Sequence, residues 1–299
     1  MIPGSTLADA YAACEALARS HYENFPVASR LLPPAMRPHI AAIYAFARVA
    51  DDLADEGHVP ADQRLAQLAA WQRRLHGALT GMRAAAEGLA AGGHEDRIIV
   101  ATAHTIATLA LPVSLFDDLV SAFGQDTTTT RYDSWADVLD YCRRSANPVG
   151  RLVLRVAGID SAALDASSDA LCTALQLTNF WQDFGRDWRG GRLYVPREVY
   201  ERAGATEDRL RDGAPGEAWA RALDECVRFT DDCFVRGRAV CDGVTGRLRY
   251  ELRATWLGGR IILRRVQQRR DRVFVDRPAL GARDVPSIAW GAFRWNGGR

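Results

Sequence analysis

The stretch Leu171–Trp188, LCTALQLTNFWQDFGRDW, decides the fold because it combines a helical apolar pattern with a continuous polar stripe. The polar positions are spaced three, four and four residues apart, so they share one face of a helix made mainly of leucine, phenylalanine, tryptophan and alanine. They are Gln176, Asn179, Asp183 and Asp187. Burying each such group without a partner costs on the order of 1–3 kcal/mol. The stripe therefore indicates either a solvated face or a polar site that requires a partner.

A second stripe of this kind lies in residues 40–56, IAAIYAFARVADDLADE. Tyr44, Arg48, Asp51 and Asp55 are spaced four, three and four apart, which places an arginine and two carboxylates on one helix face. An acidic cluster of this kind, taken alone, is most often a solvated helix end.

The two stripes together favour a metal site over two unrelated solvated faces, because carboxylates that point into a protein interior need cations. Oxygen-only pairs suit Mg²⁺, which keeps several waters and takes further ligands from substrate phosphates. The sequence therefore predicts that Asp51, Asp55, Asp183 and Asp187 bind Mg²⁺ against the diphosphate group of a substrate.

Helical periodicity runs along almost the whole chain of 299 residues, and alternating strand patterns are nearly absent. The predicted fold is all-α, with one helical domain at residues 1–275 and an irregular C-terminal tail at 276–299. The predicted helices are Leu7–Arg19, Pro34–Glu56, Pro60–Gly81, Glu95–Ala110, Pro112–Gly124, Ser134–Ala157, Asp165–Trp188, Pro196–Ala203, Gly216–Asp242 and Thr245–Phe274.

Composition excludes several classes of protein. Every basic side chain except histidine is arginine, so neither a Schiff-base lysine nor a Walker-type phosphate loop is possible. The six cysteines show no CxxC spacing and the six histidines no HExxH spacing, which argues against zinc and disulfides. A net charge of +1 without an arginine–aromatic stretch argues against nucleic acid. We expect no signal peptide and no membrane span.

Two shorter clusters follow these stripes. In GRLYVP, Arg192 and Tyr194 could close over an anion, although an ordinary helix-to-loop exit explains the same residues. In Tyr141–Gly150, YCRRSANPVG, the pair Asn147–Pro148 interrupts a helical pattern, so we expect either a helix break facing a substrate or a plain loop.

These residues resemble the squalene/phytoene synthase family of head-to-head isoprenoid synthases, from about Ser20 to Val266. The motifs that carry the resemblance are LLPP at Leu31–Pro34, AIYAFARVADDLAD at Ala42–Asp55, RY at Arg131–Tyr132, YC at Tyr141–Cys142, LQLTNFWQDFGRD at Leu175–Asp187, GRLYVP at Gly191–Pro196 and TWLGG at Thr255–Gly259. The resemblance implies an isoprenoid synthase-type helical bundle around a central cavity.

The resemblance also implies roles for individual side chains. The four aspartates would be the magnesium ligands, Arg48 a diphosphate arginine, and Tyr141 a cavity tyrosine. We expect Tyr141 or Asn147 to position a water molecule. The expected substrate-binding side chains are His21, Asn24, Tyr44, Arg48, Gln176, Asn179, Arg192 and Tyr194.

Three departures from the family pattern point to one of its branches. Tyr22 and Asn24 stand where serines are usual, Gln182 stands where an arginine is common, and the run 145–150 lacks a glycine before Val149–Gly150. These departures resemble the hydroxysqualene synthase branch of bacterial hopanoid biosynthesis. That branch is implied to convert presqualene diphosphate and water to hydroxysqualene and diphosphate, with an upstream presqualene diphosphate synthase as a possible partner.

Three alternatives stay open: head-to-head condensation of two farnesyl diphosphates, a non-catalytic helical subunit, and a head-to-tail prenyl chain elongase. The replaced serines and Gln182 argue against the first, and the intact aspartate pairs against the second. The elongase fits the DFGRD, YC and GRLYVP runs poorly. We expect a cytoplasmic protein, either free or peripheral on the inner membrane, because substrate and product are both very apolar.

Overall fold

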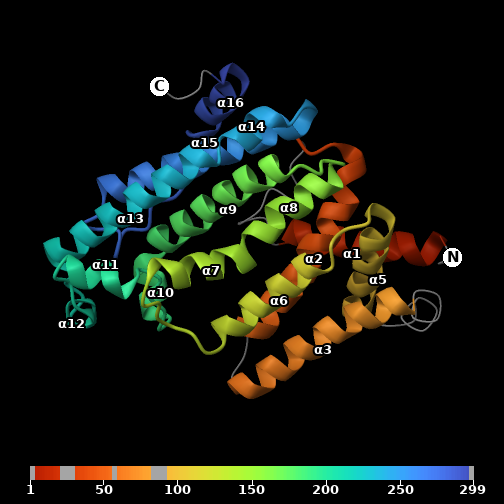
Figure 1. Cartoon of the computed structure of the whole chain (residues 1–299), viewed down its shortest axis with the longest axis horizontal. Coiled ribbons are helices and arrows are strands. Elements are labelled where there is room, and N and C mark those ends of the chain that lie inside the picture. Colours follow the sequence, from red (N-terminus) through yellow and green to blue (C-terminus); the bar gives the residue numbers. More distant parts are fainter. Residues whose placement is uncertain (1–3, 21–30, 56–58, 82–92, 296–299) are drawn as a thin grey trace. The chain divides into compact units, whose positions relative to one another are not determined.

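The computed structural model describes residues 4–20, 31–55, 59–81 and 93–295 (Figure 1). Regular structure in these ranges is helical apart from one isolated bridge between Arg131 and Leu193, so the all-α prediction is confirmed. The chain forms two compact units and crosses between them three times; they comprise residues 1–128 with 151–160, and residues 129–150 with 161–299.

The first unit is organised around one central helix, α2. Its helices are α1 (Gly4–Ser20), η2 (Pro34–Met36), α2 (Arg37–Asp55), α3 (Ala61–Thr80), α5 (His94–Leu109) and α6 (Ser114–Asp126). The fully buried ring of Phe46 on α2 stacks on Trp71 of α3, with centroids 5.4 Å apart, and meets Phe116 of α6 edge to face. The indole nitrogen of Trp71 donates a 3.3 Å hydrogen bond to the Phe46 carbonyl. These contacts fix which face of α2 is buried.

Two histidines and a threonine converge on one tyrosine hydroxyl between α1, α2 and α5. The Tyr11 hydroxyl lies 3.3 Å from His39 Nδ1, 2.9 Å from His104 Nδ1 and 2.9 Å from Thr105 Oγ1. Burial lowers the pKa of both imidazoles, and the neighbouring His104 lowers the pKa of His39 further. The cluster therefore holds two neutral histidines in the folded protein.

We expect the free energy of unfolding to fall as the pH drops below the ordinary histidine range. When folding lowers the pKa of an imidazole, the imidazole stabilises the protein at pH values above the pKa that it has in the unfolded chain. This stabilisation is lost as the pH falls through the pKa that it has in the folded protein. Urea unfolding at several pH values between neutral and acidic should show the loss. The double variant His39→Asn/His104→Gln should flatten that dependence, while Tyr11→Phe should cost about 1–3 kcal/mol at neutral pH. A wild-type pH dependence unchanged in the double variant would contradict the assignment.

The second unit is built on α9, which packs against α7, α10, α13, α14 and α15. Its helices are α7 (Trp135–Ser145), α9 (Ala162–Gln182), α10 (Phe184–Arg189), α11 (Arg197–Arg202), α12 (Glu207–Arg211), α13 (Gly216–Arg236), α14 (Ala239–Gly243), α15 (Gly246–Gln268) and α16 (Val285–Arg294), while α8 (Asn147–Val156) begins here and continues in the first unit. The fully buried indole of Trp181 on α9 donates a 2.8 Å hydrogen bond to Thr230 Oγ1 on α13.

Three of the predicted helices are broken, and one of them, predicted at Gly216–Asp242, ends at Arg236 and resumes at Ala239. The helix predicted at Ser134–Ala157 ends at Ser145 and resumes at Asn147, as expected from the proline at position 148. The helix predicted at Asp165–Trp188 ends at Gln182 and resumes at Phe184.

The prediction of an irregular tail at 276–299 is wrong for part of that range, because α16 occupies Val285–Arg294. A proline in its first turn is compatible with a helix start, and apolar residues at helical spacing pack it against α15. None of the described helices is both long and apolar enough to cross a bilayer.

Candidate functional site

The polar stripe of α2 lies opposite its buried face. Tyr44, Arg48 and Asp51 are partly exposed and Asp55 is exposed, whereas Phe46 and its neighbours on the other face are buried. Burial raises the pKa of Tyr44, while the charge of Arg48 lowers it and the charges of Asp51 and Asp52 raise it. The charged side chains of the predicted stripe therefore influence the ionisation of Tyr44 along α2.

Arg48 is engaged within its own helix. Its Nη2 lies 2.6 Å from Asp52 Oδ1, and its Nη1 lies 3.6 Å from Asp51 Oδ2. Sequence reasoning did not select Asp52 as a site residue, although it is the middle aspartate of the DDxxD run. Asp52 holds the guanidinium beside the carboxylate of Asp51, which orients the predicted diphosphate arginine.

The second stripe keeps its register through the break between α9 and α10. Asp183 stands between the two helices, yet its N–H donates to the Asn179 carbonyl and its carbonyl accepts from the Asp187 N–H, both at 2.8 Å. These are helical i to i+4 bonds, so the stripe stays continuous. Asn179 is exposed, Gln176 and both aspartates are partly buried, and the predicted placement on one face is retained across the break.

Asp183 already has a cationic partner that sequence reasoning missed. The guanidinium of Arg277 donates to it through Nε, 2.5 Å from Oδ1, and Nη2, 3.1 Å from Oδ2. The two residues are 94 positions apart, and Arg277 falls in the range predicted to be an irregular tail, so no spacing signal pointed to it. The Asp183 carboxylate is therefore held in a fork of two parallel hydrogen bonds.

The segment that carries Arg277 is fastened to α9 and α10 by its backbone. The buried amide of Gln182 donates a 2.6 Å hydrogen bond to the Pro278 carbonyl, and Arg189 donates one of 3.3 Å to the Phe274 carbonyl. A Cβ on Gly185 would lie 1.8 Å from that Phe274 carbonyl, so only glycine permits the approach. Gln182, which stands where the family commonly has an arginine, thus helps to hold another arginine at the site.

Asp187 is the most perturbed carboxyl of this stripe. Burial and, to a lesser extent, the charge of Asp183 raise its pKa to about 7, although the guanidinium groups of Arg192, Arg186 and Arg277 lower the pKa. The backbone N–H of Arg192 also donates a 2.8 Å hydrogen bond to the Asp187 carbonyl. A desolvated carboxyl beside a second one favours the approach of a cation, which fits a divalent metal ion.

Four aromatic rings gather in the second unit, and two of them, Phe180 and Tyr194, flank Asp183 and Asp187 in sequence. Phe180 and Tyr194 stack almost in parallel with centroids 3.8 Å apart, and Tyr132 stacks on Tyr194 at 5.6 Å. The ring of Tyr141 lies about 6 Å from each of the other three. All four are buried, so two of the predicted site residues, Tyr141 and Tyr194, belong to one aromatic cluster.

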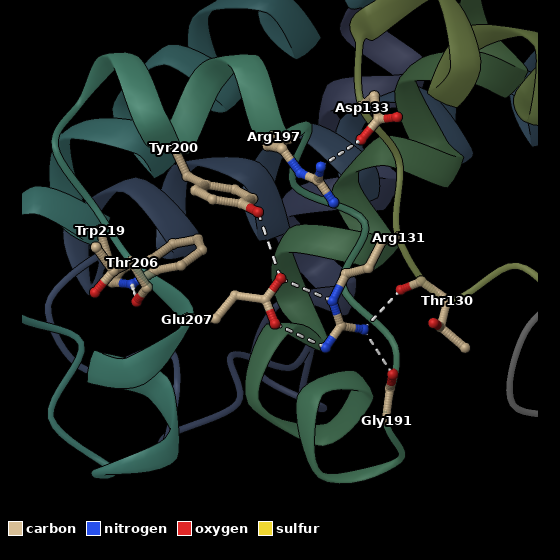
Figure 2. A network of polar contacts seen from close by, with 9 residues as sticks. All are labelled: Thr130, Arg131, Asp133, Gly191, Arg197, Tyr200, Thr206, Glu207 and Trp219. Carbon is tan, nitrogen blue, oxygen red and sulfur yellow. Dashed lines mark hydrogen bonds and ion pairs between the residues drawn. The ribbon is translucent and has the colours of Figure 1, made fainter.

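A salt bridge fixes the loop that supplies this cluster (Figure 2). Arg131 donates to both carboxylate oxygens of Glu207, at 2.9 Å and 3.0 Å, and to the carbonyls of Thr130 and Gly191, at 2.8 Å and 2.7 Å. The Tyr200 hydroxyl donates to the same carboxylate at 3.4 Å. The hydrogen bond with Arg131 lowers the pKa of Glu207, an effect that its partial burial opposes. The pair thus joins three segments that are distant in sequence.

We expect Glu207→Gln to lower the free energy of unfolding at neutral pH by about 1–2 kcal/mol, because it removes the charge from a forked, partly buried pair. The difference from wild type should shrink in acid, since a carboxyl whose pKa is lowered by folding loses its stabilising effect as the pH falls through the folded pKa. Urea unfolding measures both effects. Glu225→Gln is the matched control, since Glu225 pairs with Arg202 by one contact, and it should change stability by less than about 0.5 kcal/mol. Equal effects of the two variants would contradict the prediction.

The helix break at Ala146 sets the position of Asn147. Its amide oxygen accepts a 3.0 Å hydrogen bond from the Thr173 hydroxyl on α9, which fixes the plane of the amide. A Cβ on Gly150 would come within 2.3 Å of Ser168 and 2.5 Å of Cys172, so α8 crosses α9 where the side chain is only a hydrogen. Two further predicted residues, His21 and Asn24, lie outside the described residues.

The side chains present are compatible with magnesium. Both aspartate pairs offer only oxygen, and Mg²⁺ completes its coordination from water and phosphate, so it does not require a cage made of protein side chains. Within the described ranges, no three or more histidine, cysteine, aspartate or glutamate side chains converge on a common point. Each pair would therefore supply two carboxylates to an open site if magnesium binds there.

Known proteins provide an independent comparison. Hydroxysqualene synthases of Zymomonas mobilis and Rhodopseudomonas palustris are 43% identical over 187 residues and 39% identical over 189 residues. These matches cover 62% and 63% of this chain, and 58% and 60% of the relatives' length. The 15-cis-phytoene synthase of Synechococcus elongatus is 33% identical over a match that covers 72% of this chain and 70% of the length of the synthase.

Solved structures agree with the sequence matches. The crystal structure of squalene synthase HpnC from Alicyclobacillus acidocaldarius superimposes with a TM-score of 0.79 at 38% identity, over 89% of this chain and 96% of that chain. A dehydrosqualene synthase structure has a TM-score of 0.78 at 20% identity, which shows the shared fold, over 97% of both chains. A family profile described as squalene/phytoene synthase matches residues 18–284. The chain therefore belongs to the squalene/phytoene synthase family.

Proposed function

We propose that this protein is a hydroxysqualene synthase, which converts presqualene diphosphate and water to hydroxysqualene and diphosphate. The observation that carries the proposal is the pair Asp183 and Asp187 on one face across the α9–α10 break, with a desolvated carboxyl at Asp187 and arginines around it. Three relatives that are about 40% identical over the matched range are named hydroxysqualene synthases, and their names support the same reaction.

In this proposal Asp51, Asp55, Asp183 and Asp187 hold magnesium. When bound, Mg²⁺ neutralises a diphosphate and favours its departure. The forked guanidinium groups of this chain would stabilise the same negative charge as it develops on the leaving group, without a covalent enzyme intermediate. The arginines in question are Arg48, held by Asp52 beside Asp51, together with Arg192 and Arg277 near the second pair.

The aromatic cluster would stabilise the carbocation that remains after diphosphate has left. Breakage of the carbon–oxygen bond to diphosphate leaves a cyclopropylcarbinyl cation, and the rings of Tyr141 and Tyr194 can each stabilise such a cation by roughly 0.5–2 kcal/mol. Rearrangement opens the cyclopropane ring. A water oxygen then forms the new carbon–oxygen bond and loses one proton, so no reductant is consumed.

Two residues would position that water. The hydroxyl of Tyr141 lies in the cluster, and the amide of Asn147 is held in one orientation by Thr173. The expected partners are thus a lipophilic diphosphate and an enzyme that supplies it. The proposed location is the cytoplasm, with peripheral contact to the membrane that takes up the product.

The decisive experiment supplies presqualene diphosphate and farnesyl diphosphate separately, each with Mg²⁺, and identifies the products by mass spectrometry. The proposal requires hydroxysqualene from presqualene diphosphate, with ¹⁸O from labelled water in the product alcohol. No consumption of presqualene diphosphate would overturn it, and so would product oxygen that does not come from water.

A second function has its own support, because phytoene synthases match a larger share of this chain than the hydroxysqualene synthases do. Under that alternative the protein condenses two prenyl diphosphates head to head. Consumption of farnesyl diphosphate without added presqualene diphosphate would favour it. Release of diphosphate from neither substrate would favour a non-catalytic subunit.

A further inference from the structure

α16 is apolar on every side. Its sequence is VPSIAWGAFR, in which only Ser287 and Arg294 carry polar side chains. A helix that is apolar all round is normally buried in a core or in lipid, because an amphipathic helix needs only one apolar stripe. The other helices of the second unit cover one side of α16, which leaves the apolar character of its remaining surface to be explained.

The covered side faces α15 and the end of α14. A Cβ on Gly291 would lie 3.0 Å from the side chain of Leu257, and Ala292 is buried. Just beyond the helix, the indole nitrogen of Trp295 donates a 2.6 Å hydrogen bond to Asp242, and its ring meets Trp256 edge to face. α16 is therefore a packed element of the second unit.

The exposed, outer surface of α16 carries the apolar residues Val285, Pro286, Ala289, Trp290 and Phe293, besides Ser287 and Arg294. Val285 is 61% exposed, Trp290 59% and Phe293 67%, and the last two rings stack on each other. Of the eight large apolar side chains that are exposed in the described residues, five lie between positions 275 and 293. Three of the five lie on α16, and such a concentration marks an interaction surface.

The charge of the same region indicates what covers this surface. Residues 264–294 contain eight arginines and three aspartates. Five of these arginines pair with aspartates, namely Arg265 with Asp284, Arg269 with Asp276, Arg270 with Asp224, Arg272 with Asp271 and Arg277 with Asp183. The positive charge that remains comes from Arg264, Arg283 and Arg294. The guanidinium of Arg294 lies over the ring of Trp290, 4.9 Å from its centroid, and Arg283 is exposed just before the helix. Arginine beside exposed tryptophan and phenylalanine is the composition of segments that lie in the headgroup region of anionic membranes.

We propose that the outer surface of α16 docks peripherally on an anionic lipid membrane. The apolar side chains would enter the boundary between headgroups and acyl chains, and the excess of arginine would meet the negative surface charge. A second copy of this chain fits less well, because a twofold contact through this surface would bring two arginine-rich regions together. The inference names the surface for the membrane contact proposed above and does not depend on the reaction.

Vesicle binding by the full chain tests the proposal. Co-sedimentation should show binding to vesicles of phosphatidylcholine mixed with phosphatidylglycerol, weaker binding to phosphatidylcholine alone, and loss of binding as salt is added. Trp290→Ser/Phe293→Ser should weaken binding to the mixed vesicles about tenfold or more. The chain offers a matched pair of single variants: Val285→Ser should weaken binding, and Val235→Ser should not, although Val235 on α13 is equally exposed at 60%.

Three results would overturn the proposal: no binding by the wild type, equal binding by Trp290→Ser/Phe293→Ser, or equal losses in Val285→Ser and Val235→Ser. A concentration-dependent dimer in light scattering that the double variant abolishes would assign the surface to a second copy. Circular dichroism checks that each variant is folded, which is expected because the replaced side chains are exposed. The vesicles contain no diphosphate, so failure here would leave the proposed reaction standing.

Discussion

Replacement of Asp183 by alanine should abolish diphosphate release from presqualene diphosphate, with a loss of at least about 10³-fold, or about 4 kcal/mol of transition-state stabilisation. In the proposed reaction this carboxylate holds magnesium, and before the metal binds it holds the Arg277 guanidinium. Its removal therefore takes away the metal ligand that brings positive charge to the leaving group. A continuous assay of released diphosphate measures the effect, and the stabilisation of the protein by Mg²⁺ against heat should disappear with it.

A matched variant separates this effect from the loss of an ion pair. Asp231 on α13 also pairs with one arginine, Arg260, at 2.7 Å, so Asp231→Ala removes a comparable contact away from the aspartate stripes. We expect that variant to turn over like the wild type, and both variants to keep their helical circular dichroism. Normal turnover by Asp183→Ala would defeat the metal assignment. An equal loss in Asp231→Ala would attribute the effect to folding.

Asp187→Asn should have opposite effects on stability and on turnover. Burial, with the nearby charge of Asp183, raises the pKa of Asp187 to about 7, so the folded protein disfavours the ionised form. A carboxyl whose pKa is raised by folding stabilises the protein below the unfolded pKa, and that contribution is lost as the pH rises from about 4 to about 7. The amide that Asp187→Asn introduces does not ionise, so the variant loses no stability over this pH range. At pH 8, without divalent metal, the variant should be about 1–2 kcal/mol more stable than the wild type.

The stability difference should vanish below about pH 3, where the wild-type carboxyl is protonated in both states. Urea unfolding in the presence of a chelator measures it, and the same variant should lose diphosphate release as Asp183→Ala does. Asp276→Asn is a suitable control, because Asp276 is an exposed partner of Arg269. A variant that is less stable than the wild type at pH 8 would show that Asp187 is not a desolvated acid.

Local sequence pattern predicted most of the fold. The starts of the helices longer than ten residues, such as α3 with Leu68, Trp71 and Leu75, were located to within a few residues, whereas the ten-residue α16 was predicted to be irregular. The two polar stripes were predicted correctly as faces of helices, because the spacing alone determines which side chains share a face. α12 was missed, since five residues carry too little periodicity to be recognised.

Contacts between distant segments could not be predicted in the same way. Arg277 meets Asp183 because Gly185 leaves room for the Phe274 carbonyl and because Gln182 binds the Pro278 carbonyl. Neither contact produces a periodic pattern in the sequence. Asp52 was overlooked for another reason: it is one residue off the stripe, and its direct contact is with Arg48. The roles of the site residues remain proposals that the variants above test.

The fastening of the chain at Phe274 and Pro278 has a consequence for how a divalent ion would enter. Arg277 lies between two anchored carbonyls, so its backbone is held while its side chain, 45% exposed, can swing about its own bonds. Ion and guanidinium can then exchange at Asp183 by rotation of a single side chain, with no peptide unit displaced. Loading would then replace one counterion of Asp183 by another without backbone movement, and the released guanidinium would stay attached to a segment that is fastened beside the aspartate pair.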